Sequence, residues 1–313
     1  MTGAFPKTVC VVGPTASGKS ALAVRIAKAF GGEMISCDSM QLYRGMDIGT
    51  AKSLPEELDG VPLHLTDILD VGETFSVSDY VELAEKTALA VAGRGKLPVF
   101  CGGTGLYVDA FAKGFRFASY EKDPAVRERL YAEYRAHGGE ALYARLAAVD
   151  PAGAAGIDRA NVKRVIRALE VYESTGKPFS AVSRETRENA VDRGVLTLFL
   201  TFRERETLYA RIDRRVDAMM AAGLLEETRR LLASGLREAP TAGQAIGYKE
   251  FYPYFDGTAT LSDCVEALKR SSRRYAKRQI TWFGRNPDAV RIEMDGEDPE
   301  GAALDAVRVY LQS

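Results

Sequence analysis

A glycine-bracketed loop near the N-terminus constrains this chain more than any other stretch. Residues 13–20 read GPTASGKS, which fits the pattern G-x-x-x-x-G-K-S. The apolar, β-branched run 8–12 precedes the loop, and a run of good helix formers at 21–30 follows it. In this order of strand, glycine loop and helix, backbone N–H groups and the helix dipole can hold a phosphate group. We therefore predict a P-loop within an α/β fold that is built on a parallel sheet.

The residues of this loop have separate expected roles. Lys19 supplies a positive charge for terminal phosphate oxygens, and the hydroxyl of Ser20 is placed to ligate Mg²⁺. The loop does not indicate which phosphate ester it holds. The predicted phosphate cradle consists of Gly13, Pro14, Thr15, Ala16, Ser17, Gly18, Lys19 and Ser20.

Two further predicted strands bring polar residues to the same edge of the sheet. The run 33–37 ends at Asp38, and the run 97–101 is followed by GGTG at 102–105, which contains Thr104. Ligands bind beyond the carboxyl ends of parallel strands, so both polar residues should lie beside the P-loop. Three roles are open for Asp38: it can ligate Mg²⁺ through water, accept a proton, or cap a turn. The second of these strands lacks the terminal aspartate of many P-loop ATPases, which argues against ordinary ATP hydrolysis.

Composition narrows the class of protein. The chain has 313 residues, of which 46% are hydrophobic and 27% charged, as is typical of globular proteins. No apolar run approaches the ~20 residues needed to span a membrane. The four cysteines show no C-x-x-C spacing, so we expect buried free thiols, a cytoplasmic location and no zinc site. With two histidines in the chain, a histidine-based metal site or triad is not expected either.

The middle of the chain differs in character from its flanks. We predict a catalytic core formed by residues 1–114 and 195–313, interrupted by a helical insertion domain at 115–194. The core resumes at an apolar run, 195–202, and the polar stretch 177–193 before it is expected to be a loop. The helical segments expected in the insertion are 123–137, 140–149 and 158–174.

A helix predicted at about 262–283 carries the strongest local charge signal. Its six cations form two adjacent rows that face away from its apolar stripe, and no acidic residue lies among them. An ordinary solvated face mixes both signs, so a footprint for nucleic-acid phosphates is the better interpretation. The helix at 158–174 also carries basic residues off its apolar stripe. The six cations are Lys269, Arg270, Arg273, Arg274, Lys277 and Arg278.

Taken together, the motifs resemble one family, the bacterial tRNA dimethylallyltransferases, also called tRNA isopentenyltransferases. The resemblance extends over nearly the whole chain and depends on several motifs that occur in the same order. Besides the P-loop these are ISCDSMQLYRGMDIGTAK at 35–52, GGTGLYVDA at 102–110, DPAVRERL at 123–130, NVKRVIRALEVYESTGK at 161–177, the helix at 211–220, QAIGYKEF at 244–251 and KRQITWFGRN at 277–286.

This resemblance implies a reaction. A dimethylallyl group would pass from dimethylallyl diphosphate to the exocyclic amine of adenosine 37 of tRNA, next to the anticodon, giving isopentenyladenosine and diphosphate. The adenosine would be flipped out of its stack to expose that amine. Asp38 is implied as the general base, while Thr104, Lys19 and Arg211 would hold the leaving diphosphate with the help of Mg²⁺. Arg215, one helical turn from Arg211, is an open alternative for the same role.

The resemblance also implies a partner. The insertion domain would clasp the anticodon stem-loop of a tRNA, and we expect a monomer that does not bind membranes. The six cations of the helix at 262–283 would add contacts to the RNA. The other implied tRNA-contacting residues are Asp38, Ser39, Met40, Gln41, Thr104, Arg127, Asn161, Val162, Lys163, Arg164, Val165, Gln244, Gly247, Tyr248 and Lys249.

Two alternatives belong to other classes of protein. A P-loop metabolite or nucleotide kinase would also place an aspartate beyond the second strand, but it has no use for a helix with six cations. A non-catalytic RNA-binding regulator could use its phosphate site as a switch. An experiment with labelled donors distinguishes the three hypotheses. A prenyltransferase would transfer label from dimethylallyl diphosphate, a kinase would transfer it from ATP, and an RNA-binding regulator would transfer neither.

Overall fold

The chain builds a parallel α/β core around the P-loop. The computed structural model describes residues 5–117 and 123–313. Six strands form one sheet in the order β3-β2-β4-β1-β5-β6, and every neighbouring pair is parallel. The predicted P-loop-type core with a parallel sheet is therefore confirmed. The strands are β1 (Val9–Val12), β2 (Gly32–Ser36), β3 (Leu63–His64), β4 (Leu97–Gly102), β5 (Leu196–Thr201) and β6 (Val290–Glu293).

Strand β1 lies at the centre of this sheet. Its residue Val9 is paired with Val99 of β4 on one side and with Leu196 of β5 on the other. All four of its side chains are fully buried, as expected for a parallel strand that is covered on both faces. The loop that follows β1 therefore leaves from the middle of the carboxyl edge, where ligands of such sheets bind.

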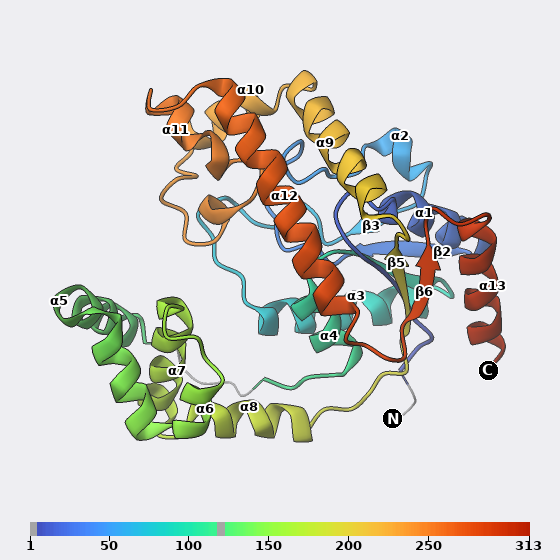
Figure 1. The fold of residues 1–313 in the computed structure, drawn as a ribbon. Coiled ribbons are helices and arrows are strands. Elements are labelled where there is room, and N and C mark those ends of the chain that lie inside the picture. The colour runs from blue at the N-terminus through green and yellow to red at the C-terminus, as the bar shows by residue number, and fades with distance from the viewer. Residues whose placement is uncertain (1–4, 118–122) are drawn as a thin grey trace. The chain divides into compact units, whose positions relative to one another are not determined.

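Contacts divide the chain into two compact units. Met1–Ala112 together with Asp192–Ser313 form unit 1, and Lys113–Val191 form unit 2. Within unit 1, α12 packs on α9, and α13 lies beside β6 (Figure 1). None of the helices in the described ranges is long and apolar enough to cross a membrane. The helices of unit 1 are α1 (Lys19–Phe30), α2 (Pro55–Leu58), α3 (Val77–Gly93), α4 (Gly105–Ala112), α9 (Arg205–Ala221), α10 (Leu224–Ala233), α11 (Tyr252–Phe255), α12 (Leu261–Phe283) and α13 (Pro299–Gln312), with 3₁₀ turns at Ala242–Gln244 and Lys249–Phe251.

All regular elements in the described residues of unit 2 are helices, as predicted for the insertion; residues 118–122 lie outside the described residues. The helices expected at 123–137 and 140–149 form one element, α5, which is kinked at Gly138, where φ is +78°. Leu130 and Leu142, on either side of the kink, both lie in the apolar core. The helices of this unit are α5 (Pro124–Val149), α6 (Pro151–Ala155), α7 (Val162–Thr175) and α8 (Phe179–Glu188).

The expectation of a loop at 177–193 is wrong, because α8 occupies most of it. Pro178 directly precedes the helix as its N-cap residue. Phe179 packs against the apolar core, and the buried carboxylate of Asp150 accepts a hydrogen bond from the Ser180 N–H at 2.8 Å. These partners lie outside the segment, and the expectation of a loop came from its polar composition.

The C-terminal elements β6 and α13 were not predicted at all. Strand β6 buries one of its four residues, Ile292, which leaves too little alternation to recognise. Helix α13 buries Ala303 and Val307 in the same apolar core as Ile26 of α1. The sheet therefore contains two strands, β3 and β6, beyond the four that the sequence predicts.

Glu33, His64 and Arg94 form a polar cluster near the start of β2, and this cluster accounts for the role of His64. Its Nε2 lies 2.7 Å from Glu33 Oε2, and Arg94 Nη2 donates to the same oxygen at 2.6 Å. The hydrogen bonds from Arg94, and then from His64, lower the pKa of Glu33 to about 2, although burial of the carboxylate opposes the shift. This cluster joins β2, β3 and the end of α3, so His64 has a structural role.

The low pKa of Glu33 predicts a pH-dependent contribution to stability. The folded pKa lies below its ordinary value of 4.5, so the charged carboxylate stabilises the fold above that pH and loses this effect as the pH falls toward 2. Glu33→Gln should lower the free energy of unfolding by about 1–2 kcal/mol at pH 7 and by less at pH 3. Urea denaturation at both pH values measures this, and an equal loss at both would contradict it.

Candidate active site

The P-loop owes its shape to its two glycines. Gly18 caps the start of α1 with φ at +91°, a left-handed conformation that glycine adopts without strain. A Cβ on Gly13 would lie 2.9 Å from the carbonyl oxygen of Leu200 in β5, so only glycine fits there. The loop therefore folds back over the end of β1 and presents its backbone at the start of a helix.

Lys19 lies inside this loop. Its Nζ donates a hydrogen bond to the carbonyl oxygen of Pro14 at 2.7 Å. Burial lowers the pKa of Lys19 to about 8; the nearby Arg215 adds to the decrease, and Asp38 opposes it. A bound anion would favour the protonated amine, so Lys19 is suited to a ligand that carries negative charge.

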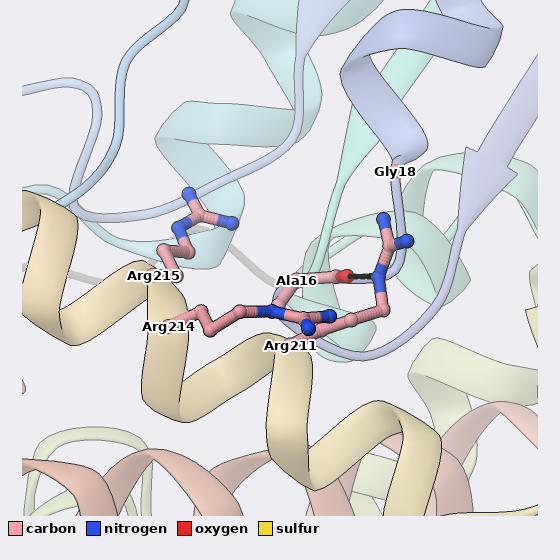
Figure 2. A pocket seen from close by; sticks show the side chains of 5 residues that line it. All are labelled: Ala16, Gly18, Arg211, Arg214 and Arg215. Carbon is pink, nitrogen blue, oxygen red and sulfur yellow. Dashed lines mark hydrogen bonds between the residues drawn. The ribbon is translucent and has the colours of Figure 1, made fainter.

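Helix α9 places three arginines opposite the P-loop, and Figure 2 shows all three. Arg211 donates from its Nε to the carbonyl oxygen of Ala16 at 2.9 Å. Together with Ala16 and Gly18, the three arginines line a pocket of about 400 Å³. Sequence reasoning left Arg211 and Arg215 as alternatives, and the structure brings both to the pocket. It adds Arg214, which the sequence analysis did not select although its spacing places it on the same helix face.

Asp38 lies on the same edge of the sheet, just after β2. Its Oδ1 accepts a hydrogen bond from the Met40 N–H at 2.9 Å, and burial raises its pKa. The Ser39 N–H donates to Thr104 Oγ1 at 2.9 Å, and the Thr104 N–H donates to the Cys37 carbonyl at 3.1 Å. The loops that follow β2 and β4 are thus joined into one rim. A raised pKa makes Asp38 a better proton acceptor than an ordinary carboxylate.

The glycines of the GGTG motif make room for neighbouring protein segments. A Cβ on Gly102 would lie 2.5 Å from the backbone of Cys37, and one on Gly103 would lie 2.0 Å from the Gln279 amide. A Cβ on Gly105 would lie 2.3 Å from the ring of Trp282. In the structure these glycines let α12 and the loop after β2 approach the end of β4.

Glu227 on α10 joins two of the motifs that carry the family resemblance. Only 2% exposed, it accepts hydrogen bonds from the Ile48 N–H at 2.9 Å, the Gly49 N–H at 3.1 Å and the Tyr248 hydroxyl at 2.8 Å. The motif at 35–52 is thereby fixed to the motif at 244–251. Gln244 is exposed, whereas Tyr248 is fully buried and supports the junction. Sequence reasoning missed Glu227, since nothing distinguishes it from other acids on an amphipathic helix.

Two of the six cations predicted to form an RNA footprint on α12 are paired with acids of a neighbouring helix. Lys269 forms an ion pair with Asp217 at 2.7 Å, and Arg273 forms one with Asp213. Both acids lie on α9, more than fifty positions earlier in the chain, so inspection of α12 alone could not reveal them. The remaining four, Arg270, Arg274, Lys277 and Arg278, are exposed.

In unit 2 the predicted tRNA contacts fall into two groups. Arg127 makes two hydrogen bonds to the buried Glu170, at 3.1 and 2.8 Å, and Val165 is a core residue. Asn161 caps α7 by accepting a hydrogen bond from the Arg164 N–H. The exposed members of the stretch 161–165 are Asn161, Lys163 and Arg164, and Val162 is half-buried.

All four cysteines are buried free thiols, as predicted. Burial raises the pKa of Cys101 on β4 to about 11, although a hydrogen bond with the Ser20 side chain acts to lower this pKa. The thiol therefore stays protonated at neutral pH. Within residues 5–117 and 123–313, no three His, Cys, Asp or Glu side chains are grouped so that they could hold a metal ion.

The ion pairs between α9 and α12 predict a difference between neighbouring arginines. Arg273→Ala removes the partner of Asp213 and should lower the free energy of unfolding by about 1 kcal/mol. The matched variant Arg274→Ala removes an exposed cation from the same helix and should change it by less than about 0.5 kcal/mol. Thermal unfolding of both measures the contrast, and equal effects would show that the ion pair contributes nothing.

The fold and the site define a class of protein. The glycine loop follows a buried parallel strand, and cationic side chains and a carboxylate with a raised pKa lie opposite it. This arrangement is typical of a P-loop protein that acts on a phosphate ester. Comparison with known sequences places the chain within that class. It matches the IPP transferase family over residues 41–286 and the isopentenyl transferase family over residues 6–67. The chain therefore belongs to the IPP transferase family of tRNA dimethylallyltransferases, which are prenyltransferases.

Individual relatives agree with this assignment. The chain is 48% identical to a tRNA dimethylallyltransferase of Shouchella clausii over 97% of this chain and 96% of the relative, and 49% identical to one of Bacillus subtilis over 91% and 90%. It resembles the crystal structure of a tRNA isopentenylpyrophosphate transferase of Bacillus halodurans with a TM-score of 0.71 and 42% identity, over 98% of both chains. It resembles a eukaryotic dimethylallyltransferase acting on tRNA with a TM-score of 0.79 and 29% identity, over 92% of this chain and 74% of that one. The family resemblance seen in the sequence is confirmed.

Proposed function

We propose that this protein transfers a dimethylallyl group from dimethylallyl diphosphate to the exocyclic amine of adenosine 37 in tRNA. One observation carries the proposal. The carboxylate of Asp38 lies near enough to Lys19 and Arg215 to change the pKa of both. A proton acceptor therefore lies beside a cradle for a leaving diphosphate, which is the arrangement that alkyl transfer to an amine needs.

The reaction balances with these groups. The adenosine nitrogen attacks the first carbon of the allylic chain and forms a C–N bond, while the bond from that carbon to the diphosphate oxygen breaks. The electron pair of the broken bond leaves with the diphosphate, and the proton of the amine passes to Asp38. Burial raises the pKa of Asp38, which favours this proton transfer.

Cationic side chains would stabilise the charge that develops on the leaving diphosphate. We assign this role to Lys19, Arg211 and Arg215, with the hydroxyl of Thr104 on the same edge of the sheet. Oxygen groups of the kind that Mg²⁺ prefers are available in the hydroxyl of Ser20 and, through water, the carboxylate of Asp38. Mg²⁺ bound there would neutralise part of the diphosphate charge.

The RNA partner would be the anticodon stem-loop of a tRNA. Exposed cations suited to phosphates lie on α12 in unit 1 and at Lys163 and Arg164 in unit 2. The polar loop at 38–41 lies beside Thr104 at the edge of the sheet, where a flipped adenosine would enter. We propose that the protein acts in the cytoplasm as a monomer.

Asp38→Asn tests the proposal at the reacting atoms. Asparagine can still accept the Met40 hydrogen bond but cannot take up a proton, so kcat for prenyl transfer should fall by a factor of about 10² to 10⁴. Affinity for tRNA should change by less than about threefold. Radiolabelled dimethylallyl diphosphate and filter binding measure the two quantities. Wild-type activity in the variant would rule out the general base, and label moving only from ATP would favour a kinase.

The exposed cations of α12 predict a salt-dependence experiment. Arg270→Ala with Arg274→Ala should weaken tRNA binding and reduce the slope of log K against log salt by about 1–2, because two phosphate contacts are lost. Inorganic diphosphate should bind as it does to the wild type. The control removes two exposed cations near α3, Lys86→Ala with Lys96→Ala, and should leave the slope unchanged. Equal slopes for both variants would refute the footprint.

A further inference from the structure

The side chain of Gln279 on α12 lies between the P-loop and the loop after β4. It is 4% exposed. Its Oε1 accepts a hydrogen bond from the Thr15 N–H at 2.8 Å, and its Nε2 donates to the Gly103 carbonyl oxygen at 3.0 Å. One buried side chain thus connects two loops at the edge of the sheet, and Thr15 uses a P-loop N–H for this contact.

The chemistry of this contact selects a carboxamide. One neighbour of the side chain is a donor and the other is an acceptor, so only a group with both functions satisfies them. Glutamate would keep the bond from Thr15 but would place an oxygen against the Gly103 carbonyl. Leucine would leave both backbone groups without this partner in a buried place. The absence of a side chain on Gly103 completes the fit, because a Cβ there would lie 2.0 Å from the Gln279 amide.

The contact continues toward the proton acceptor. Gly103 is followed by Thr104, whose Oγ1 accepts from the Ser39 N–H at 2.9 Å and whose N–H donates to the Cys37 carbonyl at 3.1 Å. Asp38 lies between those two residues. A continuous set of hydrogen bonds and peptide links therefore runs from Thr15 in the phosphate loop, through Gln279, to the segment that carries Asp38.

Other residues of α12 hold the same loop. Tyr275, one turn before Gln279, donates from its hydroxyl to the Gly103 carbonyl at 3.4 Å. Trp282, one turn after it, donates to Asp109 of α4 at 3.0 Å. These contacts keep α12 against the β4–α4 segment, and Gln279 adds a hydrogen bond to the P-loop.

We propose that Gln279 is a positioning residue that fixes the distance between the diphosphate cradle and the rim formed by Asp38 and Thr104. This inference rests on the proposed function, since it concerns the alignment of the allylic donor with the accepting amine. Each loop can bind its own ligand without Gln279, but the reacting atoms need both loops in register. A displacement of about 1 Å between aligned groups costs up to 10² in rate.

The test compares Gln279→Glu and Gln279→Ala with Thr281→Ala. Thr281 is an exposed residue of α12 whose hydroxyl donates to the Lys277 carbonyl of its own helix. Prenyl transfer gives kcat, calorimetry gives the affinity for inorganic diphosphate, and filter binding gives the affinity for tRNA. In both Gln279 variants we expect kcat to fall 10- to 100-fold while the two affinities stay within threefold of the wild type. Thr281→Ala should change none of the three.

A second variant reaches the same contact from the opposite side. Gly103→Ala displaces the Gln279 amide and should give the same fall in kcat with unchanged affinities. If both changes act through one contact, Gly103→Ala with Gln279→Ala should be no slower than the slower single variant. Additive losses would overturn the proposal, because they would show independent effects.

Other outcomes also decide the question. A kcat within threefold of the wild type in folded Gln279→Glu overturns the positioning role. Loss of diphosphate affinity in proportion to kcat, with a lowered unfolding temperature, would show a merely structural role and overturn it as well. Failure of the proposed function gives a different result, a wild-type protein that transfers no prenyl label, and would overturn both proposals.

Discussion

The burial of β1 between β4 and β5 is the constraint on which the rest of the structure depends. None of the side chains of this strand is exposed. At the carboxyl edge of the sheet the chain leaves the strand in a sharp turn. Gly13 and Gly18 permit that turn, and α1 begins directly after it. Backbone N–H groups at the start of a helix then face outward at the place where α/β proteins bind ligands. The polar groups that complete the site have to come from other parts of the chain.

Two late helices provide those groups. Helix α9 places three arginines against the P-loop, and α12 packs on α9 and on the loop after β4. Charge on these helices is divided between two uses. Lys269 and Arg273 are neutralised by acids of α9 and hold the helices together, whereas Arg270 and Arg274 remain exposed. A run of like charges on one helix therefore contains both structural ion pairs and cations available to RNA phosphates.

Much of the fold could be predicted from the sequence because its signals are local. The buried strands β1, β4 and β5 are rich in apolar, β-branched and aromatic residues, and the P-loop has a fixed pattern of residues. Helix α8 and strand β6 contain no continuous apolar run and no fixed pattern of residues. Helix α8 is held by Asp150, which accepts a hydrogen bond from Ser180, and by the apolar core against which its Phe179 packs. Strand β6 buries one of its four residues, Ile292. A segment that is stabilised mainly by partners elsewhere in the chain carries little evidence of its structure in its own residues.

For the site, the sequence by itself determined the phosphate loop, the position of Asp38 and Thr104 at one edge of the sheet, and the family to which the chain belongs. Only the tertiary structure decided that both Arg211 and Arg215 reach the pocket, that Glu227 fixes two motifs to one another, and that Gln279 fills the space left by Gly103. The physical reason is the separation along the sequence of the residues that interact. Turn conformation and strand burial depend on neighbouring residues, whereas a buried carboxylate or amide is defined by donors and acceptors that only the folded chain brings within hydrogen-bonding distance.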